Sequence, residues 1–353
     1  MGVPAIVTAG DSRAAKAIHG QSKVYLEVDG LPLVAHVVRT LQDCPEVDAV
    51  WVVGDAAKLE AALGSDRVKA ALRKPLHIVP QQRDLISNAW ETFRRVLSGD
   101  VREGRDPRPD ELDRAVFYLS GDIPLATPQE FSAFIQKAQA LDVDYALGLC
   151  PADALEIFRP QRPGEPGITL AYFNTRDGRL RQNNLHYAKP ARIGHRERIE
   201  EMYEMRHQRR FWNMFVLAMR LLASRAAGLR IAALFAMMHL AGIADRRGHP
   251  RLARLLSRRV LLETSRKTIS NILDTRFAYV ITESGGCGLD IDTEEEYDTV
   301  RERFDEWSRL LRERSEALYG PLPTERRPVE ASSETAPGGV VTGSGAHAGE
   351  GSG

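Results

Sequence analysis

Short apolar runs alternate along the first half of the chain with longer segments that carry apolar residues at helical spacing. The short runs predict buried strands, and the longer segments predict helices that cover a sheet. The predicted strands are residues 3–8, 47–53, 77–80, 115–119 and 145–149. The predicted helices are residues 32–41, 56–72 and 84–97, and one that begins at Thr127-Pro128. This alternation predicts an α/β fold with a mostly parallel sheet flanked by helices.

The second half of the chain has a different charge pattern. From Arg192 to Lys267 there are 17 Lys and Arg against 6 Asp and Glu, a net charge of +11, although the whole chain has a formal net charge of +0. This segment predicts two to four helices, before a strand at residues 277–281 and a last helix at 292–318. We therefore expect an α/β domain at 1–191 and 277–318, a basic helical insert at 192–276, and a disordered tail at 321–353, which has almost no large apolar residues.

The basic insert has several interpretations. It is a lid, a dimerisation element that makes a homodimer, or a dock on a membrane surface. Leu252, Leu255, Leu256 and Val260 form an apolar stripe at helical spacing among arginines, a pattern typical of helices that lie on anionic lipid. A helical subdomain that packs on the sheet explains the same pattern. Residues 231–244 are too few to span a bilayer.

Composition narrows the function classes. A neutral chain gives no reason to expect nucleic acid as a partner. The three cysteines, Cys44, Cys150 and Cys287, lie far apart without CxxC spacing, so a reducing cytoplasm fits best. The start of the chain lacks the basic region of a signal peptide. No motif indicates haem, zinc or a nicotinamide cofactor. We expect a cytoplasmic protein, associated with a membrane if the insert docks there.

The first loop, Ala9-Gly10-Asp11-Ser12-Arg13, follows the first predicted strand. Small residues there turn backbone N–H groups toward a ligand, and Gly10 permits a positive φ and the close approach of a phosphate. Arg13 and the later Lys23 supply the two cations that a triphosphate needs. An ordinary turn with surface charges is the alternative. Neither a GxGxxG fingerprint nor a Walker A loop is present.

Two further segments carry carboxylates. Gly121 and Asp122 follow the strand at 115–119, at the sheet edge where open α/β folds bind ligands; Gly121 would let a phosphate approach, and the Asp122 carboxylate suits Mg²⁺ (or Mn²⁺). The alternative for Asp122 is a helix cap. Near the C-terminus, Asp290 and Asp292 point the same way if that segment is extended. Asp292 or Thr293 also suits the cap of the last helix, in a capping box with a later Glu.

Taken in order, these motifs resemble a known family. The order AxxTAG, SR and K, then a strand with SGDIPL, then LDIDTEEEY, resembles nucleotidyltransferases related to molybdenum-cofactor guanylyltransferase and to sugar-phosphate and alditol-phosphate nucleotidyltransferases. Residues 28–33 resemble the GxPxL segment of that family. The resemblance covers about residues 3–150 and 277–304. It implies a Rossmann-like sheet of the GT-A type.

The resemblance also implies site residues. The triphosphate would be held by Ala9, Gly10, Asp11, Ser12, Arg13, Lys23 and Gly121, with Arg13 and Lys23 as the catalytic cations. Asp122 and Asp292 would hold Mg²⁺ or Mn²⁺, and Gln82 and Asn88 would read the base. Asn183, Asn184 and Lys189 are candidates for the acceptor, although a surface hairpin explains them equally well.

The function that follows is transfer of a nucleoside monophosphate from a nucleoside triphosphate to a small phosphorylated acceptor, a sugar or polyol phosphate, with release of pyrophosphate. One alternative is a glycosyltransferase that uses a nucleotide-sugar, but that class normally carries a DxD where this chain has only Asp122. The other is a catalytically silent nucleotide-binding protein. Asp11 beside the expected phosphates, and Ser22 where the family has proline, support that alternative.

Overall fold

The computed structural model describes residues 2–10, 17–199, 237, 240–244, 247–258 and 260–322. Three parts of the sequence predictions lie outside these residues. They are Asp11, Ser12 and Arg13 of the first loop, about half of the predicted insert (chiefly residues 200–236), and the tail beyond residue 322.

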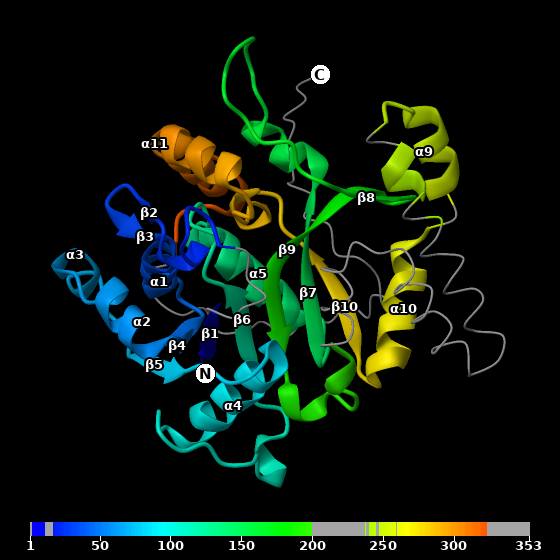
Figure 1. The fold of residues 1–353 in the computed structure, drawn as a ribbon. Coiled ribbons are helices and arrows are strands. Elements are labelled where there is room, and N and C mark those ends of the chain that lie inside the picture. Colours follow the sequence, from blue (N-terminus) through cyan, green and yellow to red (C-terminus); the bar gives the residue numbers. More distant parts are fainter. Residues whose placement is uncertain are drawn as a thin grey trace, which may run out of the picture.

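A central sheet of eight strands organises the fold (Figure 1). Its strands are β1 (Val3–Ala9), β4 (Val47–Gly54), β5 (Leu76–Pro80), β6 (Val116–Ser120), β7 (Tyr145–Pro151), β8 (Phe173–Thr175), β9 (Gly178–Ala188) and β10 (Phe277–Ile281). The order is β10-β7-β9-β6-β1-β4-β5, with β8 paired to β9. Neighbours are parallel except that β9 is antiparallel to β6, β7 and β8. The predicted mostly parallel sheet is confirmed.

A small antiparallel hairpin, β2 (Glu27–Val28) and β3 (Leu31–Pro32), stands apart from the sheet. The helices are α1 (Leu33–Gln42), α2 (Ala56–Leu63), α3 (Asp66–Lys69), α4 (Leu85–Ser98), α5 (Pro128–Ala140), α9 (Pro250–Ser257), α10 (Leu262–Leu273) and α11 (Glu294–Tyr319). Two predicted starts are confirmed by their caps. The Asp84 carboxylate accepts from the Ser87 N–H at 2.7 Å, and the Thr127 hydroxyl accepts from the Glu130 N–H at 3.3 Å. Each cap satisfies an N–H group that has no partner inside its helix.

The prediction of one helix over residues 56–72 is wrong. The structure has two helices there, α2 and α3, which Gly64 and Ser65 separate. The Ser65 hydroxyl accepts from the Val68 N–H at 3.4 Å and so caps the second helix. A new cap in mid-segment ends the first helix even though the apolar spacing continues across it.

Helices cover both faces of the sheet. On one face, α1, α2 and α5 pack on the largest core cluster, which includes Phe117 and Leu119 of β6. On the other face, α4 packs over β1 and β4 through Phe93, and α10 packs over β7 and β10. Because side chains alternate along a strand, Tyr118 of β6 faces the side of α4 and α10. Strands β6 and β9 lie between these two helices in the sheet order.

The described part of the predicted insert includes α9 and α10. Helix α10 packs on the sheet, where the Ser265 and Tyr279 hydroxyls hydrogen-bond at 2.8 Å. The apolar stripe predicted along α9 is only partly right, because Leu252 and Leu255 are 49% and 60% exposed while Val260 is buried. Over the residues that the structure describes, no helix has both the length and the apolar character to cross a membrane.

Candidate active site

The predicted motifs meet at one edge of the sheet. Thr8 pairs in register with Ser120, so parallel strands β1 and β6 end side by side. Ala9-Gly10 and Gly121-Asp122 leave the sheet at that edge. Lys23, in a short helical turn, and Asp292, just before α11, reach the same place from distant parts of the chain. Open α/β sheets bind ligands at the carboxyl ends of their strands.

Lys23 joins two of the predicted metal ligands. Its Nζ lies 2.5 Å from Asp122 Oδ2 and 2.6 Å from Asp292 Oδ1. Burial alone would lower the pKa of Lys23, but the two carboxylates raise it above its usual range. The side chain therefore stays protonated at neutral pH. The structure brings together Lys23, Asp122 and Asp292, as the motif order predicts, although Lys23 and Asp292 are 269 residues apart.

Asp122 is the buried member of this group, with 3% exposure. It also accepts a hydrogen bond from the Ser120 hydroxyl. Burial raises the pKa of Asp122, Lys23 opposes that shift, and Asp290 adds to it. The helix-cap alternative for Asp122 is wrong, because Thr127 caps the helix that follows. The Asp122 carboxylate is aimed at Lys23 instead.

Asp292 likewise does not cap its helix. Thr293 is the N-cap of α11, and Glu296 completes the capping box by accepting from the Thr293 N–H at 3.0 Å. Glu296 also accepts from the Asp292 N–H at 2.8 Å. Of the two predicted caps, Thr293 is therefore confirmed and Asp292 is wrong. The predicted capping box forms between Thr293 and Glu296, and Glu296 also holds the backbone of Asp292. The Asp292 carboxylate therefore takes no part in capping and contacts Lys23.

Asp290 is a third carboxylate at the site, which the predicted ligand set leaves out. It is 8% exposed, and its Oδ1 accepts from the Arg181 guanidinium at 2.7 Å. The signal for it was its spacing of two from Asp292, which places both carboxylates on one side of an extended segment. Arg181, on β9, also donates to the Gly288 carbonyl at 2.8 Å. Arg181 thus ties the segment that carries Asp290 to the sheet.

The three aspartates fit a divalent cation. One carboxylate oxygen from each of Asp122, Asp290 and Asp292 lies within 4.8 Å of the others. Carboxylate oxygens are the ligands that Mg²⁺ and Mn²⁺ prefer. Lys23 and Arg181 contribute two positive charges against these three negative ones, so the cluster keeps a net negative charge. The donor set therefore suits the predicted metal, with Asp290 added.

A buried polar network lies behind the loop that leads to Asp290. Glu130 of α5 has no exposed surface, and its carboxylate accepts from the Thr282 hydroxyl at 2.7 Å. It also accepts from the Gly285 and Cys287 N–H groups at 3.3 and 3.0 Å. A buried carboxylate with three donors fixes the backbone around it. Glu130 therefore anchors residues 282–287 to α5.

The glycines of the phosphate region differ from prediction in detail. Gly10 does not have the positive φ that we expected. Among the residues that the structure describes, a Cβ added there would have only Gln81 Oε1 within 4 Å, at a distance of 3.7 Å. A Cβ on Gly121 would instead meet the Thr8 carbonyl oxygen at 3.3 Å, Val34 and Val24. Neighbouring protein atoms therefore fill the Cβ position of Gly121, and its contact with a phosphate stays a prediction.

The predicted base-reading residues lie between β5 and the first turn of α4. Gln82 donates its backbone N–H to the Asn88 side-chain carbonyl. Gln81 lies close to Gly10, so this loop borders the first loop. Asn88 thus shapes the loop that carries Gln82, and the base-reading role of these two residues stays a prediction.

The three acceptor candidates separate in the structure. The surface-hairpin alternative is wrong, because they lie on or just after β9 in the middle of the sheet. Asn183 is fully buried toward α5 and donates to Thr282 Oγ1 at 2.8 Å. Its neighbour Asn184 points to the opposite face, where it lines a cavity beside Ser120. Asn184 is the one of the three that borders the site.

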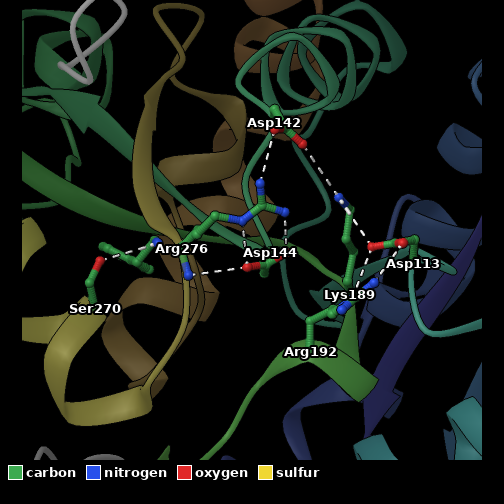
Figure 2. Close-up of polar contacts among 8 residues, drawn as sticks. Asp113, Asp142, Asp144, Lys189, Arg192, Ser270 and Arg276 are labelled. Atoms are coloured by element: carbon green, nitrogen blue, oxygen red, sulfur yellow. Dashed lines mark hydrogen bonds and ion pairs between the residues drawn. The ribbon is translucent and has the colours of Figure 1, made fainter.

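Lys189 lies at the opposite edge of the sheet from Asp122. It follows Ala188, which pairs with Val116 at the start of β6. Its Nζ lies 3.9 Å from both Asp113 and Asp142, within a surface network that also contains Arg192, Asp144 and Arg276 (Figure 2). The prediction of Lys189 as an acceptor ligand is therefore wrong. Its charge serves this ion-pair network.

Comparisons with known proteins agree with this geometry. A sequence model of the family described as MobA-like NTP transferase domain matches residues 5–266. A curated relative, 2-C-methyl-D-erythritol 4-phosphate cytidylyltransferase of Chlorobium luteolum, is 24% identical over 117 residues, which are 33% of this chain and 46% of that protein. The chain thus matches about half the length of that relative.

A solved structure shares the fold. A hypothetical transferase from Thermus thermophilus has a TM-score of 0.50 and 21% identity, over 84% of this chain and 99% of that one. A CMP:2-keto-3-deoxy-manno-octonic acid synthetase in complex with CTP has a TM-score of 0.43 and 13% identity, over 87% and 99% of the two chains. The first of these confirms the α/β fold class predicted from the sequence.

Proposed function

The chain belongs to the family of MobA-like NTP transferase domains, and we propose that it transfers a nucleoside monophosphate from a nucleoside triphosphate to a small phosphorylated acceptor, a sugar or polyol phosphate. In this reaction an oxygen of the acceptor phosphate attacks the α-phosphorus, the bond from the α-phosphorus to the bridging oxygen breaks, and pyrophosphate leaves. The predicted nucleotidyltransferase family is thus confirmed, whereas the nucleotide and the acceptor belong to the proposal.

One observation carries this proposal: Lys23 lies between Asp122 and Asp292, with Asp290 beside them, at the end of β1 and β6. An ion pair that only stabilises the fold needs one opposite charge for each charge. Three carboxylates that converge with two cations at a ligand-binding edge are the arrangement that a triphosphate and a metal require. The curated relative, a 2-C-methyl-D-erythritol 4-phosphate cytidylyltransferase, supports the same reaction class.

The residues of the chain position the two substrates and neutralise their negative charge. They do not need to abstract a proton. An acceptor phosphate that is deprotonated at neutral pH needs no general base. Lys23 would bind triphosphate oxygens and stabilise the charge that develops on the departing pyrophosphate. The backbone of Gly10, which follows β1, would lie against the phosphates. Arg13 is proposed as the second cation, as the family resemblance implies.

Asp122, Asp290 and Asp292 would hold Mg²⁺ or Mn²⁺. Such a cation, when bound, neutralises phosphate charge and orients the reacting groups. Ser120 would hold the Asp122 carboxylate in place through its hydroxyl, and Arg181 would do the same for Asp290. Asp292 would be held by its backbone bond to Glu296.

The proposal is tested by pyrophosphate release. The full chain is incubated with each of the four common NTPs, Mg²⁺ and a panel of sugar and polyol phosphates. We expect one nucleotide and acceptor pair to release pyrophosphate, and Asp122→Asn to lower kcat/KM by about 100-fold or more. Asp113→Asn is the matched control, because Asp113 lies in the network at the opposite edge. If no pair releases pyrophosphate, or if the two variants behave alike, the proposal fails.

We also propose that α9 makes a peripheral contact with an anionic membrane surface. Leu252 and Leu255 are exposed on this helix next to exposed Arg251 and Arg258. Apolar side chains among arginines suit an interface of apolar lipid and anionic headgroups. Co-sedimentation with vesicles that contain anionic lipid tests this, and binding that Leu252→Asp with Leu255→Asp leaves unchanged would contradict it. A homodimer stays a prediction that sedimentation analysis would test.

A further inference from the structure

A cavity of about 180 Å³ opens on the face of the sheet that α4 and α10 cover. It lies over β6 and β9, in the interval between the two helices. Tyr118 of β6 and His186 of β9 form its floor, Ile86, Ala89 and Trp90 of α4 form one wall, and the segment after β9 forms the other.

The lining of this cavity is apolar. Ile86, Ala89 and Trp90 face Ile193 and Ile199 across it. The Tyr118 and Tyr145 hydroxyls at its wall bond to neighbouring protein groups. The Tyr118 hydroxyl donates to the Ala89 carbonyl at 3.2 Å, and the Tyr145 hydroxyl lies 2.8 Å from His186 Nδ1.

Arg196 belongs to the same wall and is also engaged. Its guanidinium carbon lies 3.6 Å from the centre of the Trp90 ring, and its Nη1 donates to the Pro190 carbonyl at 3.2 Å. The stacked guanidinium keeps its positive charge, and these two contacts hold it against the wall of the cavity. A hydroxylated group in this space would therefore lose its hydrogen bonds to water and gain few from the protein.

The cavity borders the candidate active site. Thr8 and Ser120 line one end of it, and these two residues pair where β1 and β6 end. The Ser120 hydroxyl contacts the Asp122 carboxylate. A molecule whose phosphate lies near Lys23 and Asp122 can thus extend its remaining atoms past Ser120 into the cavity. Asn184 on β9 offers an amide along that path.

We propose that this cavity binds an apolar group of the acceptor, so that the substrate is an amphiphilic monophosphate rather than a fully hydroxylated one. This deepens the proposed function and rests on it. An apolar cavity of about 150 Å³ in another protein holds benzene, so 180 Å³ accommodates a six-carbon chain or ring. The polyol or sugar part, where there is one, lies between the phosphate and this apolar group.

The test uses a series of n-alkyl monophosphates from ethyl to octyl, with glycerol phosphate as the polar probe. Pyrophosphate release by the full chain is measured with the nucleotide that supports it, and binding of each phosphate is measured by calorimetry. Burial of a methylene favours binding by about fourfold. We expect kcat/KM and affinity to rise about 100-fold or more from ethyl to hexyl phosphate and then to level off.

Three variants test whether this cavity sets the ratio of kcat/KM for hexyl phosphate to kcat/KM for ethyl phosphate. Ala89→Trp fills the cavity and should reduce the ratio to about fourfold or less, the gain left by burying a single methylene. Ile86→Ala enlarges the cavity and should move the plateau to a longer chain. Leu97→Ala, on the same helix but outside the cavity lining, is the matched control and should keep the ratio of the unmodified protein. Because the readout is a ratio, partial loss of folded protein cancels.

The outcomes separate the two proposals. Turnover of glycerol phosphate with no dependence on alkyl chain length would overturn this inference and leave the proposed function standing. Length-dependent binding that Ala89→Trp abolishes, without turnover of any phosphate, would support the cavity as a binding site for apolar groups and count against the proposed function alone. Binding without length dependence would overturn the inference whether or not turnover occurs.

Discussion

Replacement of Glu130 by glutamine changes one buried atom of the network behind the site. In the native chain, Oε1 accepts from the Thr282 hydroxyl and the Gly285 N–H, and Oε2 accepts from the Cys287 N–H at 3.0 Å. Glutamine keeps the shape but has one acceptor oxygen instead of two. Its NH₂ group must therefore face an N–H or O–H that needs an acceptor.

The expected loss of stability follows from these three bonds. A buried donor without its acceptor costs about 1–3 kcal/mol, and the remaining bonds lose the strength that the charge provides. Removal of a buried charge offsets part of this cost. We expect Glu130→Gln to lower the free energy of unfolding by about 1–3 kcal/mol. Glu130→Ala leaves all three donors without the carboxylate and should cost about 3–5 kcal/mol.

Urea denaturation followed by circular dichroism measures both variants, with Glu302→Gln on the exposed surface of α11 as the matched control. Because residues 282–287 lead directly to Asp290, Glu130→Gln should also lower kcat about tenfold under conditions where the variant is fully folded, since small displacements of positioning groups are costly. Unfolding midpoints for both Glu130 variants equal to that of the control would refute this reasoning.

Three further predictions follow from the site and the fold. Lys23→Met should lower kcat/KM of pyrophosphate release by about 100- to 1,000-fold, the cost of losing one charge-stabilising group; a change below fivefold would contradict the proposed position of Lys23. Lys189→Met should leave kcat/KM within about twofold, because Lys189 lies in an ion-pair network (Figure 2) at the opposite edge of the sheet from Asp122. Loss of a contact to the transition state would instead lower kcat/KM by about tenfold or more. Such a loss in the same assay would restore Lys189 as an acceptor ligand. Asp84 is partly buried, but hydrogen bonds from Ser87 and the nearby Arg83 lower its pKa to about 2. The contribution of Asp84 to the free energy of unfolding is therefore complete above the unfolded pKa of about 4. It is lost as the pH falls toward 2. Thermal unfolding of Asp84→Ala and the unmodified protein should therefore differ at pH 6 and converge at low pH, whereas a constant difference would contradict this pKa shift.

Local patterns predicted the local structure well. The strands β1, β4, β6 and β7 follow short apolar runs, and the caps Asp84 and Thr127 begin the helices that their residue types predict. The break between α2 and α3 was missed because it depends on the Ser65 cap, which outweighs a continuing apolar pattern.

The sequence predicted those residues of the site that stand in short local motifs. It did not predict residues that only long-range contacts bring to the site. Asp122 and Asp292 stand out in short motifs, and the order of those motifs carried the resemblance to the family. Arg181 gave no such signal, because its contact with Asp290 joins residues 109 positions apart. Likewise, the antiparallel placement of β9 sends Asn183 to the core and Lys189 to the far edge, which no short-range pattern contains.

The central claim is that the site formed by Lys23, Asp122, Asp290 and Asp292 joins a nucleoside monophosphate to an acceptor phosphate. Phosphorus NMR of the full chain with its nucleotide, Mg²⁺ and a phosphorylated acceptor tests this most directly. The account predicts equal amounts of free pyrophosphate and of a product in which the α-phosphorus is linked to the acceptor phosphate, and neither signal with Asp122→Asn. Release of orthophosphate and nucleoside diphosphate without such a product, or an unchanged product yield with Asp122→Asn, would contradict it.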